Sequence, residues 1–434
     1  MPTGKWGSRF WENWVGPFTN TKSNVRAHTR RAWSVSVWTT TGTEQAMKII
    51  QLETFLTNAG LRNYLFVRLR TDSGLYGWGE ATLEWQELTV QTLMHEWVEE
   101  RVLGRDPFDI EAVIGGLIRD QYQGGSTVLT AISGVELALW DLVGKACGQP
   151  VYKLMGGCCR ERLPAYANGW YGGARTAEQY AERAREAVGR GYGALKFDPF
   201  GTAWKHLNRT QLAEAESLVA AVRRAVGEEV ELMIEVHGRL AVEDAVEMGR
   251  RLEKYRPYWY EEPVTPNSVE LLRQVSAALP FPVAAGERLY TLEEFHQLTS
   301  TRAAHIVQMD PAHCGGLLVS KKIAAMAQAQ DLRIAPHCSI GPVALAAALH
   351  LDFSTPNAFI QENFADYDVP WRRELAGGWD LCERGVFVLP DQPGLGLEID
   401  TAVCLAHPYR QNSFPSLWDE GWLKDFTQNE KLTG

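Results

Sequence analysis

The sequence lacks several features that would assign it to other classes of protein. No apolar run approaches the length that a membrane-spanning helix needs. Basic residues are not in excess, since 43 Lys and Arg stand against 53 Asp and Glu and the net charge is −10. Nucleic-acid phosphates require a basic face, so we expect neither nucleic acid nor a membrane as a partner. An anionic substrate remains compatible with this charge if a bound metal supplies local positive charge.

Paired cysteines are also lacking. The seven cysteines are odd in number, and none stands in a CxxC motif. We recognise no secretory signal in the sequence. Together these features predict reduced thiols and a cytoplasmic location.

The remaining composition is that of a globular protein. With 434 residues, of which 45% are hydrophobic and 22% charged, the chain is long enough for one barrel domain of ordinary size and a second domain. Residues 1–46 follow neither a strand nor a helix pattern and combine five tryptophans with an excess of basic residues. We therefore interpret residues 1–46 as a peripheral N-terminal arm.

Three glutamates at a constant interval are the main functional signal. Glu235, Glu261 and Glu287 each follow an apolar run of strand character, and 26 residues separate each from the next. One βα unit of a parallel barrel has about this length, so the side chains are expected at the carboxyl ends of consecutive strands. A single acidic residue there is ordinarily solvated or caps a helix. Three that converge repel one another unless a cation neutralises them, and an all-oxygen ligand set suits Mg²⁺.

The same rhythm predicts how the chain divides into domains. Residues 47–160 read as an α+β capping domain, in which a strand and a hairpin precede several helical segments. Residues 161–384 read as the alternating strands and helices of a parallel barrel. Residues 385–434 begin with GVFVLPDQPG, which we expect to return as a strand and complete the capping domain.

Several motifs match a known family as they stand. They are GWGEAT at residues 77–82, AISGVELALWDLVGKACGQPVYKLMGG at 131–157, EEP at 261–263, GE at 286–287, and the pair Asp310 and His337. With these motifs, residues 47–400 resemble the enolase superfamily in its mandelate racemase subgroup. The resemblance implies an α/β fold, a (β/α)7β TIM-like barrel with an N-terminal α+β capping domain completed by the C-terminal segment. It also implies that Mg²⁺ holds the substrate carboxylate while a base removes the α-proton.

The resemblance also implies roles for individual residues. Glu235, Glu261 and Glu287 fall on the metal-ligand positions, although the first position usually carries Asp and Glu235 is one methylene longer. On strand two, Lys196 occupies a carboxylate-binding position, whereas Asp198 replaces the second Lys that racemases of the subgroup use as a base. The missing lysine disfavours two-base racemisation of the mandelate kind.

His337 is the expected general base. Asp310, one strand earlier, can fix the tautomer of a neutral imidazole and stabilise its cation. Glu362 falls at the strand-eight position, where the family keeps a hydrogen-bond donor for the developing oxyanion, so Glu362 would have to be protonated. A solvated carboxylate at a strand end is the alternative reading of Glu362.

His237 decides which reaction is expected. It lies two residues after Glu235, hence on the same face of a strand, and HGR is the form seen in acid-sugar dehydratases resembling galactonate and gluconate dehydratases. There the histidine protonates the departing 3-hydroxyl, while a hydrogen bond to a metal ligand is its alternative role. Arg239 follows in the same phase and either senses a substrate group or caps the strand.

We therefore predict a Mg²⁺-dependent hydro-lyase that converts a sugar acid to a 2-keto-3-deoxy acid. Its partners are expected to be a small-molecule sugar acid and further copies of the chain, in a homo-oligomer. Two alternatives remain open. One is a racemase or epimerase of a 2-hydroxy acid that uses His237 against His337, and the other is a non-catalytic protein that binds a metal or sugar acid. Substrate specificity is expected from the cap loops around Thr57–Asn63 and Thr82–Gln86.

Overall fold

The capping domain begins with a small antiparallel sheet. The structure, a computed structural model, describes residues 47–411, so the predicted arm lies outside the described residues. The sheet has the order β1 (Ile49–Ala59), β2 (Arg62–Thr71) and β3 (Tyr76–Glu80). Gly74 takes a left-handed φ of 87° in the tight turn between β2 and β3, a conformation that favours glycine.

Helices cover this sheet, and one of them forms the centre of the capping domain. The helices are α1 (Glu87–Leu93), the π-helix η1 (Met94–Val98), α2 (Glu99–Val102), α3 (Ile110–Asp120), α4 (Ser126–Cys147) and α5 (Val151–Leu154). The expectation that no apolar run approaches membrane-spanning length was wrong, because α4 is long and apolar enough to cross a membrane. However, 83% of its apolar window is buried inside the protein, as in a core helix. It packs so closely on β3 that a Cβ at Gly79 would overlap the carbonyl oxygen of Gly134, which explains the glycines of GWGEAT.

Eight parallel strands form the barrel. They are β4 (Arg162–Ala167), β5 (Ala194–Phe197), β6 (Glu231–Glu235), β7 (Pro257–Glu261), β8 (Val283–Ala285), β9 (Ile306–Val307), β10 (Arg333–Ile334) and β11 (Gln361–Asn363). Strands β4 to β10 pair in chain order, and β11 pairs with β4. A parallel bridge between Ile334 and Ala358 spans the remaining gap between β10 and β11 and closes the barrel.

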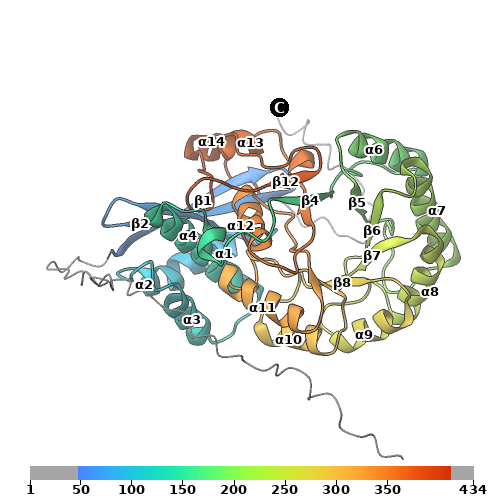
Figure 1. The fold of residues 1–434 in the computed structure, drawn as a ribbon, viewed down its shortest axis with the longest axis horizontal. Helices are drawn as coiled ribbons and strands as arrows, with labels where there is room; N and C mark the ends of the chain where they lie inside the picture. The colour runs from blue at the N-terminus through green and yellow to red at the C-terminus, as the bar shows by residue number, and fades with distance from the viewer. Residues whose placement is uncertain (1–46, 412–434) are drawn as a thin grey trace, which may run out of the picture. The chain divides into compact units, whose positions relative to one another are not determined.

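One α-helix connects each strand of the barrel to the next. Within residues 47–411 these helices are α6 (Ala177–Gly189), α7 (Arg209–Val226), α8 (Val242–Leu252), α9 (Val269–Ala278), α10 (Leu292–Ser300), α11 (Leu317–Ala329) and α12 (Pro342–Phe353), with a 3₁₀ turn η2 (Glu253–Tyr255) after α8. Helices α6 to α11 lie around the outside of the curled sheet (Figure 1). The predicted (β/α)7β barrel with an N-terminal α+β cap is thereby confirmed.

The lower interior of the barrel is filled with apolar side chains. Inward-facing residues of successive strands form one buried cluster, which includes Tyr166, Met233, Trp259, Ile306 and Ile360. Such layers make a parallel barrel a solid core rather than a channel. The triad glutamates lie at the carboxyl ends of their strands or just beyond them, on the side where the capping domain contacts the loops.

The C-terminal segment returns to the cap as predicted, although its strand belongs to the barrel. GVFVLPDQPG does contain a strand, β12 (Val386–Val388), but this strand pairs antiparallel with β4 of the barrel and not with the cap sheet. The residues after β12 do contact the cap: Leu395 N donates to Asp141 Oδ1 at 2.8 Å, and Trp78 Nε1 donates to Glu398 Oε2 at 2.9 Å. The remaining short helices are η3 (Ala365–Tyr367), α13 (Arg372–Leu375) and α14 (Thr401–Ala406).

Candidate active site

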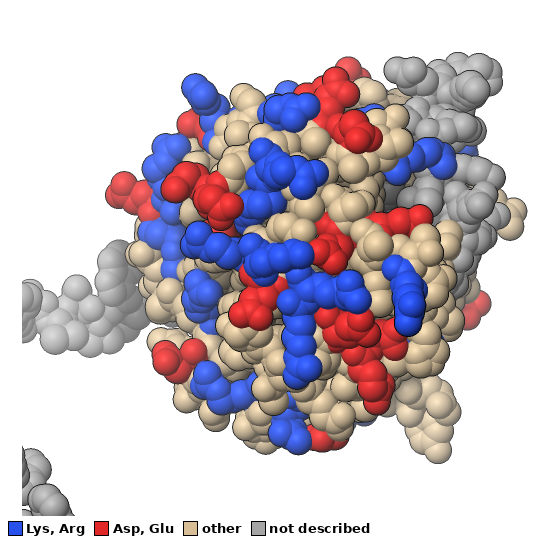
Figure 2. All heavy atoms as spheres, turned by 90° about the vertical axis from the view of Figure 1, so that its right-hand side faces the viewer, with Lys and Arg blue, Asp and Glu red and all other residues tan. Residues whose placement is uncertain are grey.

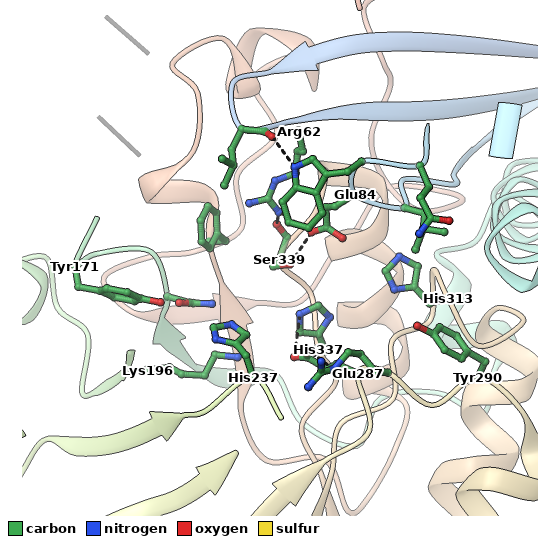
Figure 3. Close-up of a pocket in the computed structure, with 17 residues that line it drawn as sticks. Arg62, Glu84, Tyr171, Lys196, His237, Glu287, Tyr290, His313, His337 and Ser339 are labelled. Atoms are coloured by element: carbon green, nitrogen blue, oxygen red, sulfur yellow. Dashed lines mark hydrogen bonds and ion pairs between the residues drawn. The ribbon is translucent and has the colours of Figure 1, made fainter. Parts of the chain in front are cut away.

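A cavity of about 370 Å³ lies between the carboxyl ends of the barrel strands and the capping domain. Figure 3 shows side chains from both domains pointing into it. The cap contributes Leu61, Arg62 and the run from Leu83 to Gln86, which fall in the two loops expected to set specificity. The barrel contributes Asn168, Tyr171, Lys196, His237, Glu287, Arg288, Tyr290, His313, His337, Ser339 and Phe364. This volume is within the range of small-molecule sites.

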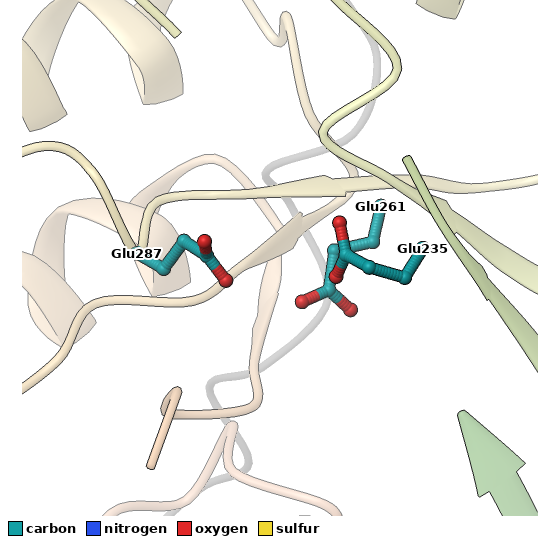
Figure 4. A group of neighbouring side chains, drawn as sticks. All are labelled: Glu235, Glu261 and Glu287. Carbon is teal, nitrogen blue, oxygen red and sulfur yellow. The ribbon is translucent and has the colours of Figure 1, made fainter. Parts of the chain in front are cut away.

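Three glutamates converge at the floor of the site. Glu235 and Glu261 are the last residues of β6 and β7, and Glu287 follows β8 by two residues. One carboxylate oxygen from each lies within 4.8 Å of the other two, so the group could hold a metal ion (Figure 4). Glu235 Oε2 is buried and accepts no hydrogen bond from the described residues, as expected of a ligand atom. The 26-residue spacing therefore predicted a real convergence of carboxylates.

The extra methylene of Glu235 is accommodated by the turn that follows β6. Glu235 Oε1 accepts hydrogen bonds from the backbone N–H of Val236 at 2.9 Å and of His237 at 2.6 Å. The carboxylate is thus held against its own backbone, and its other oxygen remains directed at the triad. A glutamate can occupy this position because the longer side chain bends back toward the turn.

Lys196 is the principal cation next to the triad among the described residues. Its Nζ lies 2.7 Å from Glu261 Oε1, 2.9 Å from Glu362 Oε1 and 3.5 Å from Glu235 Oε2. Burial and the Glu261 carboxylate raise the pKa of Glu235 well above its usual value. Burial acts in the same direction on Glu261, but the ammonium of Lys196 holds the pKa of Glu261 below its usual value. One lysine cannot compensate all these buried carboxylates, so the site favours a further cation.

His337 and Asp310 form a hydrogen-bonded pair, as the sequence predicted. The distance from His337 Nδ1 to Asp310 Oδ2 is 2.8 Å, so Nε2 is the nitrogen left to face the cavity. Burial lowers the pKa of His337, but the Glu287 carboxylate and the bond to Asp310 raise it to about 10. Because Glu287 belongs to the triad, charge neutralisation there favours the neutral imidazole that a base requires.

A second histidine–aspartate pair was not foreseen. His237 Nδ1 lies 2.7 Å from Asp198 Oδ2, so the residue that replaces the racemase lysine orients His237. Strand alternation did not place His237, because β6 ends at Glu235 and His237 has a left-handed φ of 53°. It nevertheless lines the cavity, as Figure 3 shows. Asp198 follows β5 and His237 follows β6, and these two strands are neighbours in the sheet.

Arg239 does not line the cavity, which corrects one of the two roles considered for it. Its guanidinium is fully buried and donates to the carbonyl oxygens of Val236 at 2.9 Å and of Gly201 at 2.9 Å, and it also pairs with Asp198. Arg239 therefore fixes the turn after β6 and the loop after β5. It supports the position of Asp198.

Glu362 is held as an acceptor, which differs from the protonated donor that was expected. Its Oε1 accepts from Lys196 Nζ at 2.9 Å and from Asn168 Nδ2 at 2.8 Å, and its Oε2 accepts from Cys338 N at 2.9 Å. Burial raises the pKa of Glu362, but Lys196 and His337 hold it below its usual value. Glu362 is also fully buried, so it is not a solvated strand-end carboxylate either.

Several polar residues of the site escaped the sequence reading. Asn168 directly follows β4, so the strand-end rule that found Asp310 would have found it too. His313 lies three residues after Asp310, and its Nδ1 is 3.4 Å from Asp310 Oδ2. Arg62 of the cap pairs with Glu84 at 3.0 Å and also donates to the Ser339 carbonyl. No spacing in the sequence signals this last contact, because it joins two domains.

Comparison with known proteins agrees with this geometry. The chain is 36% identical over 370 residues to a D-gluconate dehydratase of Thermoproteus tenax, covering 85% of this chain and 74% of that protein. It is 37% identical over 365 residues to a D-galactonate dehydratase of Verminephrobacter eiseniae (strain EF01-2), covering 83% and 94%. A crystal structure of a mandelate racemase/muconate lactonizing enzyme from Sulfitobacter sp. matches with TM-score 0.78 and 34% identity, covering 85% of this chain and 97% of the other.

The fold and the site belong to an enzyme of the enolase superfamily. The family model of the enolase C-terminal domain-like fold matches residues 179–403. The model of the mandelate racemase/muconate lactonizing enzyme N-terminal domain matches residues 30–156. The chain therefore belongs to the mandelate racemase/muconate lactonizing enzyme family, and it is an enzyme of the hydro-lyase class.

Proposed function

We propose that the enzyme dehydrates a sugar acid of the aldonate type to a 2-keto-3-deoxy acid in a Mg²⁺-dependent reaction. The observation that carries this proposal is the presence of two histidine–aspartate pairs in one cavity beside an acidic triad. Loss of water from carbons 2 and 3 needs a base for the C2 proton and an acid for the 3-hydroxyl. The two pairs supply these two groups.

Glu235, Glu261 and Glu287 would hold the metal. Glu235 Oε2 is buried and accepts no hydrogen bond from the described residues, and the three carboxylates approach one another, which supports this assignment; an all-oxygen set suits Mg²⁺. When bound, Mg²⁺ would offset the negative charge that builds on the substrate carboxylate as the C2 proton leaves. Lys196, which lines the cavity beside the triad, would bind an oxygen of the same carboxylate.

His337 would remove the C2 proton. The C2–H bond breaks, the proton passes to Nε2 of His337, and the electron pair enters the carboxylate, giving an enediolate. Asp310 accepts the Nδ1–H of the imidazole and stabilises the imidazolium that forms. Glu362, as an ionised carboxylate, would hold Lys196 and Asn168 in place rather than donate to the substrate.

His237 would complete the reaction as general acid. The electron pair of the enediolate expels the 3-hydroxyl, the C3–O bond breaks, and Nε2–H of His237 protonates the departing oxygen to give water. Asp198 accepts the Nδ1–H, which directs Nε2 toward the cavity. The enol product then tautomerises to the 2-keto-3-deoxy acid, so one water is lost in total.

An aldonate is the substrate class that the surroundings favour. The relatives described above are a gluconate and a galactonate dehydratase, and both names denote six-carbon sugar acids. The cap side of the cavity carries Arg62, Glu84 and Gln86, which offer donors and acceptors for hydroxyls at the far end of such a chain.

Epimerisation at C2 is the second candidate function. It has support from the same geometry, because a protonated His237 could give its Nε2 proton to C2 of the enediolate on the face opposite His337 and become neutral. The replacement of the racemase lysine by Asp198 argues only against a mechanism in which a lysine is the second base. Here His237 could act opposite His337 instead. The two functions differ in whether a keto acid appears.

The test is a screen of aldonates in D₂O with Mg²⁺, reading keto-acid formation and deuterium at C2 of recovered substrate. Wild type is expected to form a keto acid from at least one six-carbon aldonate. His337→Asn should lose both keto-acid formation and exchange. His237→Asn should retain exchange but lose about 10²–10⁴-fold in keto-acid formation, the usual contribution of a general acid.

Other outcomes decide against dehydration. Inversion at C2 without a keto acid would establish the epimerase. Neither activity over a broad panel of sugar acids, with Mg²⁺ still bound in calorimetry, would favour a non-catalytic binding protein.

A further inference from the structure

Two fully buried carboxylates of the cap have no place in the reaction described above. Glu80 belongs to GWGEAT, and Glu136 lies in the middle of α4, within the long motif that follows. Neither lines the cavity, and neither has a Lys or Arg within ion-pair distance among the described residues. Burying a carboxylate lowers the stability of the fold unless hydrogen bonds satisfy the carboxylate. The groups that donate these hydrogen bonds therefore indicate its structural role.

Glu80 binds the loop that leaves His337. Its Oε1 accepts from the backbone N–H of Gly341 at 2.7 Å, and its Oε2 accepts from Val343 N at 3.1 Å and Ala344 N at 3.0 Å. Gly341 is four residues after His337 and is the N-cap residue of α12. Glu80 therefore caps a barrel helix from the capping domain and fixes the chain just beyond the base.

Glu136 binds the loop that leaves Asp310 in the same way. Its Oε2 accepts from Leu317 N at 2.8 Å and its Oε1 from Leu318 N at 2.9 Å, at the start of α11. One turn earlier on α4, Ser133 Oγ accepts from Gly315 N at 2.8 Å. The partner of the base is thus also anchored to the cap.

Both helices depend on these remote caps. The N-cap residues of α11 and α12 are glycines, Gly316 and Gly341, which have no side chain to cap their own helix. A Cβ at Gly316 would overlap the carboxylate of Glu136, and one at Gly341 would overlap that of Glu80. Glycine is therefore needed at both positions to let the cap carboxylate approach the helix end.

A third contact links the end of β3 to the loop that follows Asp310. The backbone carbonyl of Thr82 accepts a hydrogen bond from His313 Nε2 at 2.8 Å, and His313 Nδ1 is 3.4 Å from Asp310 Oδ2. The Thr82 hydroxyl donates to Glu80 Oε1 at 2.8 Å. The strand end that holds the His337 loop therefore also contacts the Asp310 loop.

We propose that Glu80 and Glu136 are positioning residues of the His337–Asp310 pair. The cap holds the two loops that carry the pair at a fixed separation, so docking of the cap sets the alignment of the base. The expected effect on the catalytic rate rests on the proposed function, whereas the expected effect on the alignment of His337 and Asp310 does not. A displacement of reacting groups by about 1 Å typically costs 10²-fold in rate, so small shifts of these loops should be measurable.

Asp141 provides a matched control. It lies on α4, it is fully buried, and it accepts from Trp78 N at 2.8 Å and Leu395 N at 2.8 Å. A Cβ at Gly394 would overlap its carboxylate, so a glycine again admits a buried carboxylate of α4. Asp141 differs in that it also pairs with Lys145 Nζ at 2.8 Å, and the C-terminal segment that it binds at Leu395 carries no residue of the site. Asp141→Asn should therefore reproduce the loss of stability without the loss of alignment.

The experiment compares Glu80→Gln, Glu136→Gln and Asp141→Asn, each checked for folding by circular dichroism. Measurements at pH 8 keep Glu136 ionised, because burial raises its pKa to about 7. In ¹⁵N-histidine-labelled enzyme, the Nδ1–H proton of His337 is assigned as the signal lost in His337→Asn. Glu80→Gln and Glu136→Gln should shift this signal or broaden it away, and should lower kcat by about 10-fold or more at nearly constant KM. Asp141→Asn should leave both readouts unchanged.

Gly341→Ala is the second variant in case Glu80→Gln does not fold. Gly341 has a φ of −76°, so alanine fits its backbone and acts only by displacing the Glu80 carboxylate. It should give the same change in the His337 signal. An unchanged signal in all folded Glu80, Glu136 and Gly341 variants, or an equal change in Asp141→Asn, would overturn the proposal. If wild type dehydrates no sugar acid, the NMR signal still decides the positioning role.

Discussion

Asp198 is the clearest difference between this site and that of the racemases that use a lysine base. It stands at the position where those racemases carry the lysine. Its carboxylate accepts from His237 Nδ1 at 2.7 Å and also pairs with the buried Arg239. The ion pair with Arg239 keeps the pKa of Asp198 below its usual value in spite of burial. An ionised Asp198 is the form that can hold a protonated His237.

We expect Asp198→Asn to separate the two halves of the reaction. The amide can donate to Nδ1 and stabilise the wrong tautomer of His237, so keto-acid formation should fall by about 10²–10⁴-fold. Exchange of the C2 proton in D₂O should persist, since His337 and Asp310 are untouched. Loss of exchange together with dehydration would instead show that Asp198 supports the whole site. Asp244→Asn, at the N-terminus of α8, is a control carboxylate outside the cavity.

The acidic triad gives a prediction that does not depend on the substrate. Glu261→Gln and Glu287→Gln should each abolish Mg²⁺ binding in isothermal titration calorimetry, because each removes one charged oxygen ligand of three. Glu270→Gln, on the exposed side of α9, should bind Mg²⁺ like wild type. Activity of wild type in excess EDTA, or unchanged Mg²⁺ affinity in both triad variants, would contradict the metal assignment.

At the level of elements, helix α12 joins the site to the capping domain. Its first turn receives Glu80, and near its other end His350 is fully buried, with Nδ1 accepting from Tyr152 N at 3.0 Å. Burial lowers the pKa of His350 to about 4. The histidine is therefore neutral in the folded protein at pH values where it would be charged in the unfolded chain.

This difference predicts acid sensitivity. Between pH 6.5 and 4 the unfolded chain binds a proton at His350 that the folded protein does not, so the free energy of unfolding falls as the pH falls. From pH 7.5 to 5 the loss from this group should be about 2 kcal/mol. The measurement is urea unfolding of wild type and His350→Gln in EDTA at both pH values. The glutamine variant should lose less stability over this interval, and parallel losses would refute the role of His350.

At the scale of the whole molecule, the face that includes α7 and α8 carries charges of both signs. Figure 2 shows basic and acidic side chains interspersed over the face that includes α7 and α8. Several of them form ion pairs, such as Arg251 with Glu247 at 2.9 Å and Lys254 with Glu216 at 2.5 Å. A mixed surface of this kind lacks the continuous basic face that phosphate backbones require.

Deletion of residues 1–46 tests the predicted arm. Every residue assigned to the site lies after it, and β1 begins at Ile49. We therefore expect the truncated enzyme to fold, to bind Mg²⁺ and to retain activity within about 3-fold, since no reacting group is displaced. Size-exclusion chromatography with light scattering would compare the oligomeric states of the two forms. An insoluble or inactive truncation would show that the first 46 residues belong to the fold.

The barrel and the triad could be predicted because both follow from repetition along the chain. A strand and its crossover helix occupy a nearly constant length, so residues at the same phase of the repeat reach the same end of the barrel. This logic gave Glu235, Glu261 and Glu287, and it placed Asp310 and His337 on neighbouring strand ends. Local sequence is sufficient when each side chain needs only its own strand to bring it to the site.

Contacts between separate elements were decided by the tertiary structure. The partner of His237 depends on the pairing of β5 with β6 and on a left-handed turn that strand alternation does not describe. The pKa of Glu362 is held below its usual value by Lys196 and His337, and Asn168 adds a hydrogen bond, so its surroundings come from other strands. Glu80 and Glu136 gained their partners only through docking of the cap on the barrel. A hydrogen bond forms only when donor and acceptor are about 3 Å apart. A single sequence does not show which groups on distant elements come that close.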